Sequence, residues 1–128
     1  MNWYILYLEC GFEKMMRFVC KSVNIEDVLR CSFGLNRTEL DILMLLLSSE
    51  NEFTSSQIIS KIKKDKSTVQ RCLKSLVEKE LVIRFQINLE QGGYYFKYRS
   101  VNKNSIKKKL NEIFMNFSKM VEKKIDSF

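Results

Sequence analysis

The 128-residue chain is long enough for one domain with a sizeable core, and no apolar run reaches the ~18 residues that a membrane-spanning helix needs. Its net charge of +7 is concentrated in residues 61–109, which contain 14 Lys or Arg and 4 Asp or Glu, whereas residues 1–60 contain 5 Lys or Arg and 8 Asp or Glu. This local excess of positive charge indicates a polyanionic partner. The chain has no His, no phosphate-binding loop, no H-E-x-x-H and no G-x-S-x-G, so we expect neither an enzyme nor a cofactor.

The first 22 residues are the hardest to interpret. Residues 3–8 are aromatic and branched enough for a strand, and residues 12–19 could form either a helix or a strand. The start has no basic region and meets a charge at Glu9, which is not typical of a signal peptide. We therefore expect a cytoplasmic protein.

Two helices are predicted next. The first covers about residues 25–33, because Asn24 is a good N-cap and Gly34 suits the position just beyond a helix end. The second begins after Asn36, whose spacing to Glu39 is that of a capping box, and runs to about Ser49. It is apolar on nearly all sides, so it should be buried by more than one neighbour, including the N-terminal segment, the C-terminal helix or a partner subunit.

A pair of helices joined by a tight turn follows the polar connection at residues 50–53. Thr54 and Gln57 form another capping box, residues 63–65 form the turn, and Asp65 caps a helix over about residues 66–80. One side of this last helix is apolar and consists of Val69, Cys72, Leu73, Leu76 and Val77. Its other side carries Ser67, Gln70, Arg71 and Lys74, which are side chains able to reach base edges and phosphates.

After Glu80 the pattern changes to the alternation of β-strands. Residues 81–89 and 94–101 alternate apolar and polar side chains and are joined through Gly92-Gly93, which predicts a β-hairpin. The alternation places Phe96 and Tyr98 on the inward side. It assigns Arg84, Lys97 and Arg99 to the polar face.

The last segment predicts a long helix from about Asn104. Its apolar stripe consists of Ile106, Leu110, Ile113, Phe114, Phe117, Val121 and Ile125. A stripe of this length exceeds what a small core can cover. We expect it to pack against its copy, or against the N-terminal helix, of a second subunit; packing within its own protomer is the alternative.

Residues 34–101 resemble the winged helix-turn-helix regulators of the archaeal TrmB-like group and the broader MarR-like set. The matching segments are GLNRTELDILMLLL, TSSQIISKI, KDKSTVQRCLKSLVEKELV and GGYYFKYRSV. The resemblance implies a mainly α fold with a small β-hairpin (α+β), in which the helix at 66–80 is the recognition helix and residues 81–101 form the wing. With the resemblance over its middle, the chain is expected to divide into three parts: an N-terminal extension at 1–34 as a candidate dimer contact, a DNA-binding domain at 35–101 and, from its apolar stripe, a dimerisation helix at 102–128.

The same resemblance implies a DNA-binding regulator that acts as a homodimer on a pseudo-palindromic site. Base contacts are expected from Lys66, Ser67, Thr68, Gln70, Arg71 and Lys74. It implies backbone contacts from Ser55, Ser56, Arg84, Lys97 and Arg99. Lys64 and Lys74, as cations beside or on the same helix, are also expected to hold phosphates. The large C-terminal effector domain of TrmB-like sugar sensors has no counterpart here, so sugar binding is not implied. Glu80 stands where many relatives have Gly, and we expect it to lengthen the recognition helix slightly.

Other functions compete with this interpretation. A winged helix can serve as a protein-interaction or assembly module, since fold alone does not determine function. The aromatic residues of the wing, Tyr94, Tyr95, Phe96 and Tyr98, could stack on bases in RNA or single strands, although alternation favours core packing for the last two. The cysteines include no C-x-x-C pair of a zinc site; Cys72 is expected in the core, and redox sensing by Cys10, Cys20 or Cys31 stays open.

Overall fold

The computed structural model describes residues 23–128, which form five helices and a three-stranded antiparallel sheet. The elements are α3 (Ile25–Phe33), α4 (Arg37–Ser48), β1 (Phe53–Thr54), α5 (Ser55–Ile62), α6 (Lys66–Glu78), β2 (Val82–Asn88), β3 (Tyr94–Ser100) and α7 (Lys103–Asp126). This mainly α winged-helix arrangement confirms the predicted fold class. Residues 3–8 and 12–19, and the thiols of Cys10 and Cys20, lie outside the described residues.

The predicted helix starts are confirmed. The side-chain oxygen of Asn36 accepts the backbone N–H of Glu39 at 2.7 Å, and the Glu39 carboxylate accepts the backbone N–H of Asn36 at 3.2 Å. Thr54 and Gln57 make the same reciprocal pair at the start of α5, at 3.3 and 2.9 Å. Each pair satisfies two N–H groups that have no partner within the helix.

Helix α4 lies at the centre of the core, in contact with α3, α5, α6 and β3. Leu29 of α3 and Ile106 of α7 belong to the same buried cluster, so α3 and the start of α7 supply part of the expected cover. The side chains with almost no exposed surface are Leu40, Ile42, Leu43, Leu46, Ile58, Val69, Leu73, Leu76 and Leu81. Their burial supplies the main apolar driving force that holds α6 against the rest of the domain.

The sheet has the order β1-β3-β2, and its shortest strand was not predicted. Phe53 and Thr54 pair with Tyr98 and Lys97, where the sequence predicts only the end of a polar connection and a helix N-cap. Two residues are too few for alternation to reveal a strand. This pairing ties the start of α5 to the wing.

The register of the wing corrects one prediction. Arg84 lies opposite Tyr98, whereas Arg99 lies opposite Ile83 and Lys97 opposite Phe85. Directly opposite residues of an antiparallel pair share a face. Arg84 therefore lies on the inner face with Tyr98, and Lys97 and Arg99 lie on the outer face, so the prediction of a shared polar face is wrong.

The end of α6 also differs from expectation. The helix ends at Glu78, and Glu80 has a φ of 61° instead of lengthening the helix. The N–H of Leu81 donates to the carbonyl of Leu76, and that of Glu80 to the carbonyl of Val77, both at 3.0 Å. This is a Schellman end in which Glu80 takes the left-handed position that Gly usually occupies.

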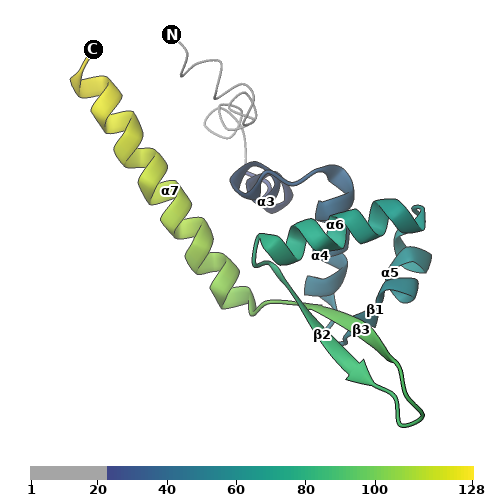
Figure 1. Cartoon of the computed structure of the whole chain (residues 1–128). Helices are drawn as coiled ribbons and strands as arrows, with labels where there is room; N and C mark the ends of the chain where they lie inside the picture. Colours follow the sequence, from purple (N-terminus) through teal and green to yellow (C-terminus); the bar gives the residue numbers. More distant parts are fainter. Residues whose placement is uncertain (1–22) are drawn as a thin grey trace.

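Helix α7 extends away from the helical body, as Figure 1 shows. Near its start Ile106 is buried and Leu110 packs against the core. Farther along, Val121 and Ile125 are exposed. Among the described helices, α7 included, none has the length and apolar character needed to cross a membrane.

Candidate nucleic-acid interface

Asp65 determines how α6 begins. Its carboxylate accepts the hydroxyl protons of Ser67 and Thr68, both at 2.6 Å, and the backbone N–H of Thr68 at 3.1 Å. These hydrogen bonds, with that of Ser67 foremost, hold the pKa of Asp65 well below its usual range. Because both hydroxyl protons already have an acceptor, Ser67 and Thr68 can offer an external partner only their oxygen lone pairs.

The two sides of α6 differ as the sequence predicts. Val69, Cys72, Leu73 and Leu76 are buried. On the opposite side Lys66, Ser67, Arg71 and Lys74 are exposed, and Thr68 and Gln70 are half-buried. The exposed side therefore carries three cations within nine residues of helix.

A groove of about 470 Å³ lies between α6 and the inner face of the wing. Its walls are Gln70, Arg71, Leu73, Lys74, Val77, Glu78, Arg84 and Tyr98. The guanidinium carbon of Arg84 lies 4.4 Å from the ring centre of Phe96, which is a cation–π distance. Three cations, Arg71, Lys74 and Arg84, thus border one groove with an apolar floor.

A second recess, of about 370 Å³, lies on the other edge of α6, toward the start of α4. It is lined by Asn36, Thr38, Glu39, Thr68, Arg71, Cys72 and Ser75. Arg71 lines both hollows and so occupies the ridge between them.

The remaining predicted residues lie elsewhere. Lys97 is paired with Thr54, next to the start of α5, where Ser55 is half-buried and Ser56 is exposed. The recess beside Lys97 is lined by Glu50, Asn51, Glu52, Phe53 and Gln57. Lys64 is exposed in the turn between α5 and α6. Arg99 is exposed on the outer wing face, away from the α6 groove.

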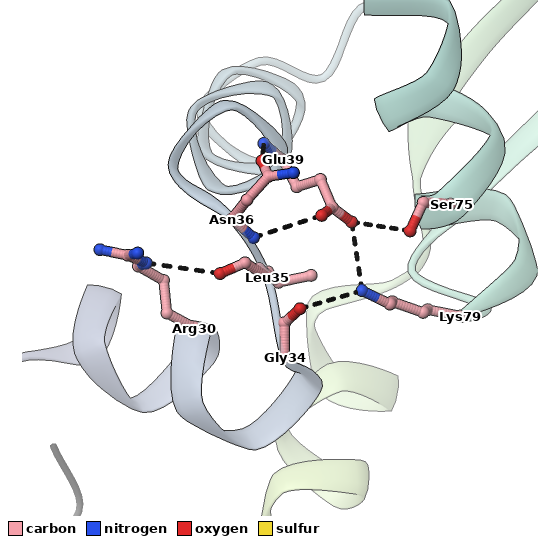
Figure 2. Close-up of polar contacts among 7 residues, drawn as sticks. All are labelled: Arg30, Gly34, Leu35, Asn36, Glu39, Ser75 and Lys79. Atoms are coloured by element: carbon pink, nitrogen blue, oxygen red, sulfur yellow. Dashed lines mark hydrogen bonds and ion pairs between the residues drawn. The ribbon is translucent and has the colours of Figure 1, made fainter. Parts of the chain in front are cut away.

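A partly buried polar cluster between α4 and one edge of α6 was not predicted (Figure 2). The side chain of Glu39 is only 7% exposed. One of its oxygens, Oε2, accepts the hydroxyl of Ser75 at 2.8 Å and the ammonium of Lys79 at 3.2 Å. The Lys79 ammonium also donates to the carbonyl of Gly34 at 3.2 Å. The capping-box spacing identified Glu39 as a residue of a helix start. Its contacts with Ser75 and Lys79 join residues 36 and 40 positions apart, which no local sequence pattern indicates.

The thiol of Cys72 lies in the core, as expected. Burial, together with the negative charge of Glu39, raises its pKa. Such a thiol is a poor nucleophile at neutral pH. Within residues 23–128 no three His, Cys, Asp or Glu side chains are grouped closely enough to hold a metal ion.

Known proteins resemble this chain in sequence. The family model described as "Sugar-specific transcriptional regulator TrmB" matches residues 29–104. The uncharacterized protein MJ1503 of Methanocaldococcus jannaschii is 30% identical over 112 residues, covering 84% of this chain and 84% of that protein.

Solved structures of similar fold are also known. A possible transcriptional regulator from Methanosarcina mazei is 30% identical, with a TM-score of 0.77 over 85% of this chain and 92% of that chain. TrmBL2, an archaeal chromatin protein whose structure is described as showing a novel mode of DNA binding, has a TM-score of 0.52 at 19% identity, over 80% of this chain and 35% of that chain. At that identity the second likeness concerns the fold alone.

Proposed function

The chain belongs to the TrmB family of winged-helix transcriptional regulators, and from this premise we propose that it binds double-stranded DNA sequence-selectively as a homodimer. In this proposal α6 enters the major groove and the wing lies along the sugar-phosphate backbone. The observation that carries the proposal is the exposed cationic side of α6 beside a groove that Arg84 borders from the wing.

Base reading is assigned to the middle of α6. Arg71 is exposed on the ridge between two hollows, and an Arg there can donate two hydrogen bonds to guanine O6 and N7. Gln70 can read adenine with its amide in the same bidentate way. Ser67 and Thr68 act only as acceptors, because Asp65 takes their protons. This favours contacts with base amino groups at the start of the helix.

Backbone contacts are assigned to the cations around α6 and to the start of α5. Lys66 and Lys74 are residues of α6, Arg84 borders the α6 groove from the wing, and Lys64 precedes the helix. The paired strand residues Thr54 and Lys97 bring a cation next to Ser55 and Ser56, where the α5 N-terminus also favours a phosphate. Arg99, on the outer face, lies away from these cations.

Dimerisation is assigned to α7 with a contribution from the N-terminal extension. The exposed Val121 and Ile125 continue the apolar stripe that begins at the buried Ile106. A second copy would bury these side chains and set two α6 helices about 34–36 Å apart on one side of the duplex.

The test is duplex binding measured by fluorescence anisotropy across a range of salt concentrations. If each protomer neutralises about four phosphates, the slope of log K against log salt should be about −7. An equally long single strand serves as competitor, because preference for it would support the RNA or single-strand alternative. A slope near zero, or no duplex binding at about 150 mM salt, would favour an assembly module instead.

A further inference from the structure

The Glu39 cluster holds α6 at two points along one of its edges. Ser75 and Lys79 are four residues apart, so they lie on the same face one turn apart. Both donate to a single oxygen of Glu39, which α4 carries in its first turn. Figure 2 shows the two side chains reaching from α6 toward this carboxylate.

Arg71 continues the same row of α6, one turn before Ser75. It lines the recess that also contains Glu39 and Ser75. The anchor row and the proposed base reader therefore belong to one edge of the helix. A rotation of α6 about its own axis would displace Arg71 and break the Glu39 contacts together.

The other contacts of α6 restrict that rotation less. Its buried side makes apolar contacts through Val69, Leu73 and Leu76, and apolar burial is not directional. Hydrogen bonds to a charged group are directional and weaken steeply away from linearity. Several rotations of α6 would bury the same apolar side chains. The contacts of Ser75 and Lys79 with Glu39 can therefore select one of them.

We propose that Glu39 is a positioning residue for DNA recognition, which fixes the rotation of α6 through Ser75 and Lys79 and so determines which bases Arg71 reaches. This inference rests on the proposed function. The Lys79 contact with the carbonyl of Gly34 extends the anchor to the end of α3, so that α3, α4 and α6 hold one another at this point.

The test compares the parent protein with Glu39→Gln, which keeps the side-chain shape and removes the charge. Dissociation constants are measured for the preferred duplex, for its single base-pair variants and for an unrelated duplex. We expect the ratio of the dissociation constant for the unrelated duplex to that for the preferred duplex to fall about ten-fold, as for one mismatched base pair. The dissociation constant for unrelated DNA and the salt slope should not change. If Glu39 contributes only to stability, the variant should bind both duplexes more weakly by the same factor, or bind both as the parent does.

Two further variants complete the design. Asp41→Asn removes a carboxylate of the same helix whose partner is the exposed Arg37 at 3.3 Å, and it should leave the ratio unchanged. Ser75→Ala keeps the ion pair, should fold even where Glu39→Gln does not, and should lower the ratio about three-fold. In the Glu39→Gln background it should add nothing, because both act through one contact.

An unchanged ratio in folded Glu39→Gln, or in Ser75→Ala if Glu39→Gln does not fold, would overturn the positioning role while leaving the proposed function standing. A folded parent that binds every duplex alike would overturn the proposed function itself, and the positioning role with it.

Discussion

At the scale of single residues, the wing cations differ in what surrounds them. Arg84 lies over the Phe96 ring and borders the α6 groove, whereas Arg99 is exposed on the opposite face. Arg84→Ala should weaken duplex binding and reduce the salt slope by about one, since it removes one phosphate contact. Arg99→Ala, which removes the same charge from the other face, should change both less. Equal effects in anisotropy titrations would mean that charge alone, and not the groove, attracts DNA.

Asp65 makes a residue-scale prediction about pH. Its pKa is lowered in the folded protein, so its contribution to stability is present above the unfolded value of about 4 and is lost as pH falls toward the folded value. Asp65→Asn should therefore be less stable than the parent at pH 7, and the difference should shrink at about pH 3. Urea unfolding at both pH values measures it. A difference that is independent of pH would show that the charge of Asp65 contributes nothing.

At the scale of elements, the junction between α6 and β2 contains a residue in an unfavourable conformation. Glu80 adopts a φ of 61°, which costs a non-glycine residue about 1 kcal/mol. Its carboxylate lies 3.8 Å from Lys109 and is 82% exposed, so that ion pair contributes little. Its carbonyl also accepts the Lys109 ammonium at 2.7 Å, a contact that any residue would keep.

Glu80→Gly should therefore raise the free energy of unfolding by about 0.5–1 kcal/mol. The control is Glu80→Ala, which removes the same carboxylate but keeps the Cβ, and which should bring no gain. Chemical denaturation of the three proteins compares them. If the Gly and Ala variants are equally stable, the left-handed backbone is not the cause.

Features that depend on neighbouring residues, such as helix starts, could be predicted from the sequence. Features that depend on contacts between distant residues, such as the register of the wing, could not. The capping boxes at Asn36 and Thr54 act within four residues, so their spacing located α4 and α5 correctly. The faces of the wing depend on the register between β2 and β3, which alternation within one strand does not contain. This is why Arg84 was grouped with Lys97 and Arg99 although the register separates them.

The same distinction applies to the candidate site. Charge and amphipathic spacing identified the exposed side of α6, because these are properties of one helix. The Glu39 cluster joins residues that are 36 and 40 positions apart, and no sequence pattern around Ser75 or Lys79 predicts these contacts.

At the scale of the whole molecule, α7 makes a prediction about assembly. If its apolar stripe packs against a second copy, the double variant Val121→Lys and Ile125→Lys should dissociate the dimer, since each change would bury a charge at the interface. Met115 is 61% exposed and lies off the stripe, so Met115→Lys should leave the dimer intact. Analytical ultracentrifugation measures the mass of each. A monomeric parent would contradict the role proposed for α7.

The central claim is that the exposed side of α6 reads duplex DNA, and selection of bound sequences from a random duplex pool tests it most directly. The parent should enrich two half-sites related by two-fold symmetry, with centres about 10 base pairs apart. Arg71→Ala should lose the preference at one position of each half-site, at a cost of about 1–3 kcal/mol on the parent's best sequence. A parent pool without enrichment, or an identical motif from Arg71→Ala, would contradict the claim.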